Sequence, residues 1–277
     1  MSDYESRGKE VIMERIDLLL VKRGLALSRE KAKALIMAGE VMVEGKVIDK
    51  PGTRVALEAE IKVDEGPPYV SRGGLKLSRA LEVFRVEIKG RICLDAGAST
   101  GGFTDCLLQN GAEKVIAVDV GYGQFAWKLR QDPRVVLMEK TNIRYLTPDQ
   151  LPVIPSLITA DLSFISITKV LPALIGILPL DGEIISLIKP QFEAGRDKVG
   201  KNGVVRSAET HREVLTTVVQ AGFESGLTCA GLTYSPLLGA KGNIEFLIYW
   251  QKGEAPRTKP SAEKLANIVN QAWENLK

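Results

Sequence analysis

The chain of 277 residues lacks long apolar runs, has only three cysteines and contains a single histidine. Its most apolar stretch, residues 170–180, is short and carries two prolines, whereas a membrane-spanning helix needs about 20 apolar residues. The first ten residues are polar and have no apolar segment of the kind found in secretory signals. We therefore expect no membrane span and a cytoplasmic location. Cys93, Cys106 and Cys229 suit no metal site by their spacing, and we expect them to be buried free thiols.

Charge is nearly balanced over the whole chain, at a net +3, but it is unevenly distributed. Residues 15–33 contain six basic and two acidic side chains, and residues 72–91 contain the same numbers, so each segment has a net charge of +4. Local basic clusters of this kind are typical of surfaces that bind polyanions such as nucleic acid. A solvated helix face explains the charges alone equally well.

The N-terminal part of the chain combines helical and strand-like patterns within about 50 residues. The predicted elements are a helix over residues 16–23, a helix over residues 29–38, a hairpin over residues 41–48 and a strand-like segment over residues 53–63. Ser28 is a typical N-cap for the second helix, and Glu44-Gly45 is a typical hairpin turn. These patterns predict a small α+β unit with a thin core.

Residues 14–63 resemble the S4 RNA-binding domain. The residues that carry the resemblance are Arg15-Ile16-Asp17, Gly24, Ser28-Arg29, Ala32, Ile36, Gly39, Val41, Val43 and Gly45. The resemblance implies that the two helices present basic side chains to RNA, and Arg and Lys neutralise phosphates and release counterions. The candidate RNA-binding residues are Arg15, Lys22, Arg23, Arg29 and Lys33.

The rest of the chain has a different pattern, in which short apolar runs alternate with helical segments. Such alternation predicts an α/β fold of the Rossmann-like type, with a mainly parallel sheet covered on both faces. The last two runs, near residues 227–234 and 243–250, have no helix between them and predict an antiparallel pair, and residues 261–276 predict an amphipathic helix. The expected organisation is a polar N-terminal tail (1–13), an S4-like domain (14–63), a proline-containing linker (64–70) and a Rossmann-like domain (71–277).

A glycine-rich segment joins the first strand of this second domain to a helix, where ligands of such sheets bind. The segment contains Asp95, Gly97, Ser99, Thr100, Gly101 and Gly102. A dinucleotide fingerprint would need glycine at position 99. A hydrolase nucleophile elbow fits the spacing around Ser99, but its base would have to be His211, which we expect on the surface or at a helix start.

S-adenosylmethionine is the third candidate ligand, and it suits these residues best. Asp95 would lie near its ammonium group, and Asp119, at the end of the second strand, would accept hydrogen bonds from its ribose. Asn142 follows the third strand and would lie beside the adenine. Asp119 can also be read as a plain strand-end cap.

Four charged residues stand next to apolar strands: Lys76, Asp161, Lys189 and Glu245. Buried together they would form an ion network, and their place at the cofactor edge favours catalysis over a purely structural network. They resemble the Lys-Asp-Lys-Glu tetrad of FtsJ-type ribose 2′-O-methyltransferases. Over residues 14–250 the chain is similar to the TlyA (haemolysin A) family of ribosomal RNA 2′-O-methyltransferases. Further residues carry this resemblance: Ser71-Arg72-Gly73-Gly74, Asp119-Val120-Gly121-Tyr122-Gly123-Gln124, Lys189-Pro190-Gln191-Phe192-Glu193, Gly203-Val204-Val205-Arg206 and Gly242-Asn243.

The resemblance implies an S-adenosylmethionine-dependent enzyme that methylates cytidine ribose in ribosomal RNA or ribosomal subunits. Lys189 would activate the 2′-hydroxyl, Asp161 would orient Lys189, and Lys76 and Glu245 would position the ribose. Base N-methylation is an alternative, because residues 161–164 faintly resemble an amino-methyltransferase motif, although its two prolines are missing. A membrane-active haemolysin and a purely RNA-binding protein are the non-enzymatic alternatives.

Overall fold

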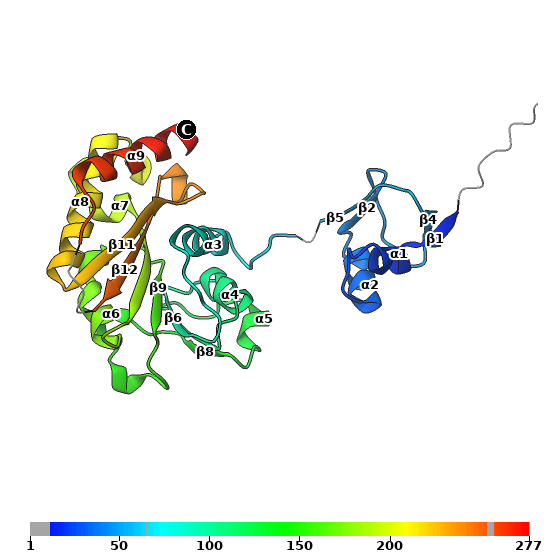
Figure 1. The fold of residues 1–277 in the computed structure, drawn as a ribbon, viewed down its shortest axis with the longest axis horizontal. Helices are drawn as coiled ribbons and strands as arrows, with labels where there is room; N and C mark the ends of the chain where they lie inside the picture. The colour runs from blue at the N-terminus through cyan, green and yellow to red at the C-terminus, as the bar shows by residue number, and fades with distance from the viewer. Residues whose placement is uncertain (1–11, 65, 254–257, 277) are drawn as a thin grey trace, which may run out of the picture. The chain divides into compact units, whose positions relative to one another are not determined.

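The computed structural model describes residues 12–64, 66–253 and 258–276, and these residues form two compact units that are divided between Pro68 and Tyr69. Figure 1 shows the elements of each unit. Most of the predicted polar tail lies outside the described residues, and Met13 already begins a strand. Among the described residues, no helix is both long and apolar enough to cross a membrane.

The first unit is built from two helices and two small sheets. Its elements are β1 (Met13–Arg15), α1 (Ile16–Lys22), α2 (Arg29–Met37), β2 (Val41–Val43), β3 (Lys46–Val47), β4 (Arg54–Ala56) and β5 (Ile61–Val63). One sheet has the order β3-β2-β5, and the other pairs β1 with β4. Both helices bury an apolar stripe in one small core, which includes Ile16 and Ile36.

Local signals in this unit act as the sequence predicts. The Ser28 side chain accepts a hydrogen bond from the Lys31 backbone N–H and caps α2. The predicted hairpin is confirmed, because Val43 pairs with Lys46 across a turn in which Glu44 and Gly45 both have positive φ.

The second unit contains a seven-stranded sheet. Its helices and strands are α3 (Gly73–Phe84), β6 (Ile92–Ala96), α4 (Gly102–Gln109), β7 (Lys114–Val118), α5 (Trp127–Arg130), β8 (Val135–Met138), β9 (Leu157–Ala160), α6 (Leu171–Ile177), β10 (Glu183–Ile188), α7 (Pro190–Glu193), α8 (Ala208–Glu224), β11 (Leu227–Tyr234), β12 (Phe246–Lys252) and α9 (Ala262–Leu276). The strand order is β11-β12-β10-β9-β6-β7-β8. The strands from β10 to β8 in this order are parallel, and β12 runs antiparallel to both β10 and β11. The predicted mainly parallel sheet with an antiparallel end is confirmed.

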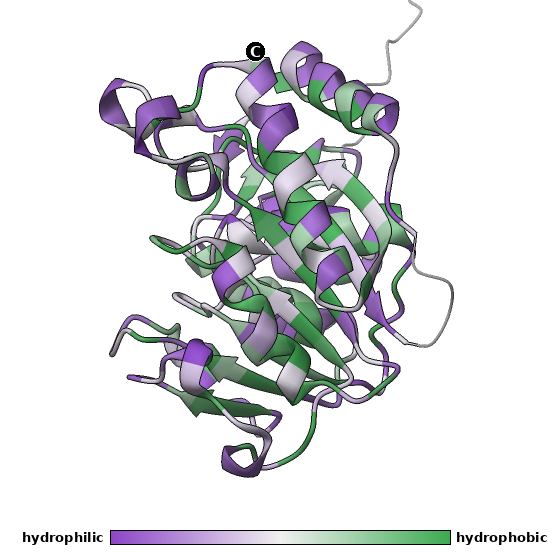
Figure 2. Ribbon diagram, turned by 90° about the vertical axis from the view of Figure 1, so that its left-hand side faces the viewer, coloured by the Kyte–Doolittle hydropathy of each residue, from purple (hydrophilic) through white to green (hydrophobic). Residues whose placement is uncertain are grey.

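Helices cover both faces of this sheet. The helices α6, α8 and α9 share one apolar core with the strands, and α3, α4 and α5 share the other. The pleat of β6 explains the division, since Leu94 points into the first core and Cys93 into the second. Figure 2 shows the strands of the sheet mostly in the hydrophobic colour, which agrees with their burial between two helical layers. The amphipathic helix predicted near the C-terminus is α9.

The structure also shows where the three cysteines and the histidine named in the sequence analysis lie. Cys93 and Cys106 are buried free thiols as expected, whereas Cys229 is only half-buried. His211 lies in the first turn of α8, which confirms the expected helix start, but it is fully buried and not on the surface. Its Nδ1 accepts a hydrogen bond from Trp273 Nε1 of α9, because α8 and α9 pack together.

Candidate active site

The glycine-rich loop follows β6 and leads into α4 at the carboxyl edge of the sheet. Gly97 has a φ of 86°, and a Cβ atom there would lie 2.7 Å from the carbonyl oxygen of Asp161. A side chain is therefore excluded by both backbone conformation and space. The absence of a side chain at Gly97 lets the end of β6 lie directly beside the segment that follows β9. The loop and Asp161 consequently form one site.

Asp95 lies under this loop and is fully buried. Its Oδ2 accepts hydrogen bonds from the backbone N–H and the hydroxyl of Thr104, at 3.0 and 2.7 Å. Its Oδ1 is buried and has no hydrogen-bond partner among the described residues. Burial raises the pKa of this carboxyl to about 7. Asp95 therefore keeps one buried oxygen atom available for a further hydrogen bond.

Asp119 follows β7 and connects two loops. Its Oδ2 accepts a hydrogen bond from the Ser99 backbone N–H at 2.8 Å, and its Oδ1 accepts one from the Gly121 N–H at 2.6 Å. The Gln124 side-chain amide donates to the same Oδ1 at 3.2 Å. The carboxylate thus holds the glycine-rich loop against the loop after β7, in addition to capping the end of a strand.

Asn142 caps a short 3₁₀ helix, Ile143–Tyr145, with its side-chain oxygen accepting from the Arg144 backbone N–H at 3.1 Å. Asn142, Asp119 and Asp161 line a cavity of about 460 Å³. Val118, Ile143 and Leu162 are among its apolar lining residues. The three candidate polar residues therefore surround one partly apolar space.

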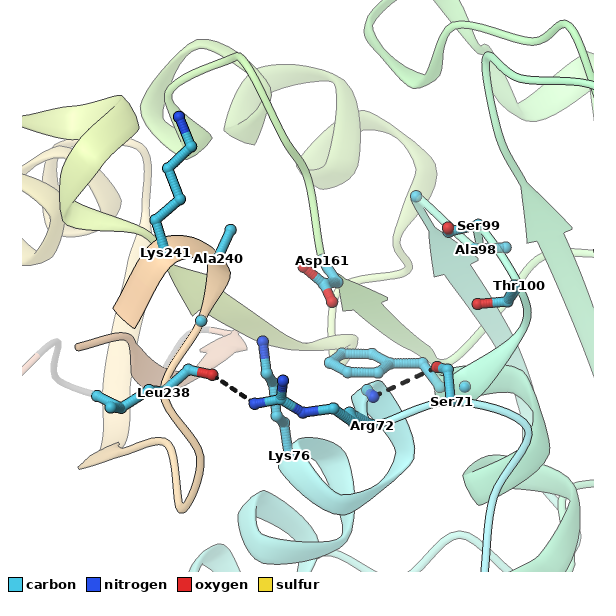
Figure 3. A pocket seen from close by; sticks show the side chains of 15 residues that line it. Ser71, Arg72, Lys76, Ala98, Ser99, Thr100, Asp161, Leu238, Ala240 and Lys241 are labelled. Carbon is cyan, nitrogen blue, oxygen red and sulfur yellow. Dashed lines mark hydrogen bonds between the residues drawn. The ribbon is translucent and has the colours of Figure 1, made fainter. Parts of the chain in front are cut away.

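A second cavity, of about 310 Å³, adjoins the first, because Gly97, Ser99 and Asp161 line both. Its other lining residues include Lys76, Ser71, Thr100 and Gly102. Figure 3 shows Asp161, after β9, between the loop that carries Ser99 and Thr100 on one side and Lys76 of α3 with Ala240 and Lys241 on the other. The two cavities therefore lie next to each other at the carboxyl edge of the sheet, and they share Gly97, Ser99 and Asp161.

Lys76 forms a buried ion pair with Glu245, which immediately precedes β12. The Nζ and Oε2 atoms are 2.6 Å apart, and the side chains are 11% and 2% exposed. Glu245 packs directly on Gly239, where a Cβ atom would lie 1.9 Å from Oε1. Glycine at this position therefore makes room for the carboxylate.

Lys189, directly after β10, forms the second pair, with its Nζ 2.5 Å from Asp161 Oδ1. The angles of this contact are not those of a hydrogen bond, and Asp161 Oδ1 has no hydrogen-bond partner in the described part of the chain. Lys189 Nζ does donate a hydrogen bond to Ser163 Oγ at 3.0 Å. Sequence reasoning did not single out Ser163, because a serine in a loop carries no distinctive signal.

The four charged residues therefore form two lysine–carboxylate pairs: one joins α3 to the residue before β12, and the other joins the residues directly after β9 and β10. Lys76 and Asp161 line the same cavity, which brings one member of each pair together. The described residues contain no group of three or more His, Cys, Asp and Glu side chains that could hold a metal ion.

The candidate RNA-binding residues lie in the first unit. Arg15 and Arg29 each form an ion pair at 3.0 Å with Asp17, whose side chain is fully buried. The hydrogen bond from Arg15 is the main cause that lowers the pKa of Asp17 to about 2, against the opposing effect of burial. Asp17 thus fixes two partly exposed guanidinium groups near each other.

The remaining three candidates differ in how their side chains are engaged. The Arg23 guanidinium donates to the backbone carbonyl oxygens of Leu57 and Ala59, so it also holds the segment between β4 and β5. Lys22 is exposed and Lys33 is half-buried. Lys22 is the candidate most free to contact a polyanion.

Two family profiles match the chain. The profile described as FtsJ-like methyltransferase covers residues 69–252, and the S4 domain profile covers residues 14–61. These ranges agree with the two structural units.

Relatives extend over nearly the whole chain. It is 49% identical to YqxC of Bacillus subtilis, over 95% of both chains. It is 46% identical to the 16S/23S rRNA (cytidine-2′-O)-methyltransferase TlyA of Mycobacterium tuberculosis, over 93% of this chain and 96% of the relative. A solved structure from Streptococcus thermophilus, of a protein that carries the name hemolysin, is 46% identical with a TM-score of 0.73, covering 96% of this chain and 98% of the other. The chain therefore belongs to the TlyA family of FtsJ-like methyltransferases, which combines an S4 domain with a Rossmann-like methyltransferase domain.

Proposed function

We propose that this protein transfers a methyl group from S-adenosylmethionine to the ribose 2′-oxygen of a cytidine in ribosomal RNA. The observation that carries the proposal is the pair of lysine–carboxylate contacts beside the glycine-rich loop. Buried lysines are costly unless they are paired, and two of them at the ligand-binding edge of the sheet favour chemistry on a hydroxyl.

The residues present fit S-adenosylmethionine. The unpartnered Oδ1 of Asp95 suits an ammonium group nearby, and the loop from Gly97 to Gly102 allows close approach of a ligand. Asp119 would accept hydrogen bonds from the ribose hydroxyls, and Asn142 would flank the adenine in the larger cavity. When bound, the cofactor supplies a sulfonium methyl group that an oxygen nucleophile can displace.

The side chains of the tetrad would have distinct roles. Lys189, as an uncharged amine, would accept the proton that leaves the 2′-hydroxyl as the oxygen–methyl bond forms. Asp161 would hold Lys189 at the cavity and stabilise it once it is protonated. The Lys76–Glu245 pair would bind and orient the ribose, and alignment of the two reactants would supply much of the rate.

Ribose methylation explains this site better than base methylation. Methylation of an amino group on a base needs hydrogen-bond acceptors that orient this group, and it does not require two lysines. The segment Asp161-Leu162-Ser163-Phe164 also lacks the prolines of the amino-methyltransferase motif.

The S4 domain would supply affinity for RNA. Arg15, Lys22, Arg23, Arg29 and Lys33 would contact phosphates, and the paired Arg15 and Arg29 are already fixed by Asp17. The name of the Mycobacterium tuberculosis relative includes 16S and 23S rRNA, and both ribosomal subunits are therefore the substrates to test. Such a substrate implies a cytoplasmic protein.

The test is transfer of labelled methyl groups to naked ribosomal RNA and to intact subunits by wild type and by a Lys189→Ala variant. A 2′-O-methyl group blocks alkaline cleavage at its own phosphate. We expect label in alkali-resistant dinucleotides with wild type and a loss of at least about 100-fold in the variant.

Two other outcomes would contradict the proposal. Label in mononucleotides would move the target to a base. No transfer to any RNA, together with equal lysis of cells by wild type and Lys189→Ala, would support the activity implied by the hemolysin name of the Streptococcus thermophilus relative.

A further inference from the structure

We propose that Ser163 is a positioning residue for Lys189, whose lone pair it directs toward the substrate hydroxyl. The inference rests on the proposed ribose methylation and goes beyond the four tetrad residues. Its basis is the hydrogen bond from Lys189 Nζ to Ser163 Oγ at 3.0 Å.

The two contacts of Lys189 Nζ differ in kind. Asp161 Oδ1 lies at 2.5 Å but outside hydrogen-bond geometry, so it provides attraction without a strict direction. Ser163 Oγ meets both the distance and the angles of a hydrogen bond. Hydrogen bonds weaken steeply as their angle departs from linearity, so the serine sets the orientation of the amine.

The number of hydrogens on the lysine nitrogen gives this orientation a chemical meaning. An uncharged amine has two hydrogens and one lone pair in a tetrahedral arrangement. With one hydrogen on Ser163 Oγ, the electrostatic attraction of Asp161 favours the second hydrogen on the side of that carboxylate, and the lone pair then occupies the position away from both oxygen atoms. When the lone pair accepts the 2′-hydroxyl proton, the ammonium ion has three hydrogens, Ser163 Oγ remains its hydrogen-bond acceptor, and Asp161 attracts its charge.

The residues around the Lys189 amine and Ser163 restrict the orientations that the amine can adopt. Lys189 is only 9% exposed, so its amine cannot turn freely to water. Ser163 lies in the short segment after β9, and the next residue, Phe164, has a φ of 63°. A positive φ is uncommon for an aromatic residue and requires support from surrounding structure. The backbone at this turn therefore holds the serine at a defined place beside the cavity, which Ser163 and Asp161 both line.

The test compares Ser163→Ala, Ser163→Thr and wild type for kcat, for KM with RNA, and for S-adenosylmethionine affinity by calorimetry. Removal of a hydrogen bond to this group should lower kcat by about 10- to 100-fold. KM and cofactor affinity should stay within about twofold, because the serine acts on the chemical step. Threonine retains the hydroxyl and should restore most of kcat. The matched control is Ser225→Ala, because that hydroxyl only bonds a carbonyl at the end of α8.

The outcomes separate this inference from the proposed function. Active wild type with an unchanged kcat in Ser163→Ala would overturn the role of Ser163 and leave ribose methylation intact. A lower kcat of Ser163→Ala that threonine does not restore would indicate a structural role and would also overturn the inference. Equally large changes in KM and in cofactor affinity would do the same. Wild type without methyl transfer would contradict the proposed function itself.

Discussion

Gly239 offers a sharp test of how the buried Lys76–Glu245 pair is held. Its φ of −74° suits any residue, so an alanine there meets no backbone strain. The added Cβ atom would, however, lie 1.9 Å from Glu245 Oε1 and 2.2 Å from Cδ. Since an ordinary van der Waals contact is longer than about 3.4 Å, the carboxylate must move by about 1.5 Å.

The cost follows from the burial of the pair. Glu245 Oε2 is 2.6 Å from Lys76 Nζ, and a move of this size takes it beyond hydrogen-bond distance. Separation of a buried ion pair costs about 3–5 kcal/mol. We expect Gly239→Ala to destabilise the methyltransferase domain by about 3 kcal/mol. A domain of this size loses about 2–4 °C per kcal/mol, which predicts a Tm lower by about 6–12 °C.

Thermal unfolding of the full chain measures this effect, and methyl transfer measures the accompanying loss of activity. Gly176→Ala is the matched control, because a Cβ atom there has nothing within 4 Å and lies inside α6. That change should leave activity unchanged and raise stability by about 0.5–1 kcal/mol.

A double-mutant comparison identifies the cause. In a Glu245→Ala background the carboxylate is absent, and Gly239→Ala should then cost less than about 1 kcal/mol more. Equal Tm values for Gly239→Ala and wild type, or the same cost in both backgrounds, would refute the reasoning.

Three further predictions concern single groups. Because burial keeps the pKa of Asp95 near 7, this carboxyl is protonated near pH 6, and binding of a cationic cofactor should release a proton. Binding enthalpies in buffers of different ionisation enthalpy should then differ for wild type but not for Asp95→Asn; identical wild-type values would exclude the coupling. The hydrogen bond from Arg15, with a smaller contribution from Arg29, lowers the pKa of Asp17 from 3.8 to about 2, so the stabilisation that the Asp17 carboxylate gives to the fold is complete above pH 4 and is lost as pH falls toward 2. Amide signals of α1 should weaken over that range in wild type, and an equally steep loss in Asp17→Asn would contradict the assignment. Arg23→Ala should destabilise the S4 domain by about 1–2 kcal/mol, because two hydrogen bonds to carbonyl oxygens are lost. Lys22→Ala should leave stability unchanged, weaken RNA binding and lower the salt slope of binding by about 1. Unfolding and filter-binding measurements in which Lys22→Ala is the less stable variant would contradict this assignment.

Much of the fold was available from the sequence by itself, because the signals are local. Apolar residues at intervals of two or of three to four report a strand or a helix wherever it packs, and Ser28 and Glu44-Gly45 specify a cap and a turn through their own backbone chemistry. The glycine-rich loop and Asp119 were also recognisable, since ligands of such sheets bind where parallel strands end. The four charged residues next to apolar strands were also recognisable as a candidate network, whereas their assignment as a catalytic tetrad depended on a family resemblance.

Only the tertiary structure decided which of these side chains meet. Lys76 and Glu245 are 169 residues apart, and they pair because α3 packs beside β12. The hydrogen bond from Lys189 to Ser163 depends on parallel pairing of β9 and β10, and the burial of His211 depends on α9 packing against α8. From the sequence, Arg23 was expected to be a cation that contacts RNA, and only the fold places its guanidinium against the carbonyl oxygens of Leu57 and Ala59. Periodicity along a chain reports how each segment is buried, whereas contacts between distant segments arise only from how the elements pack.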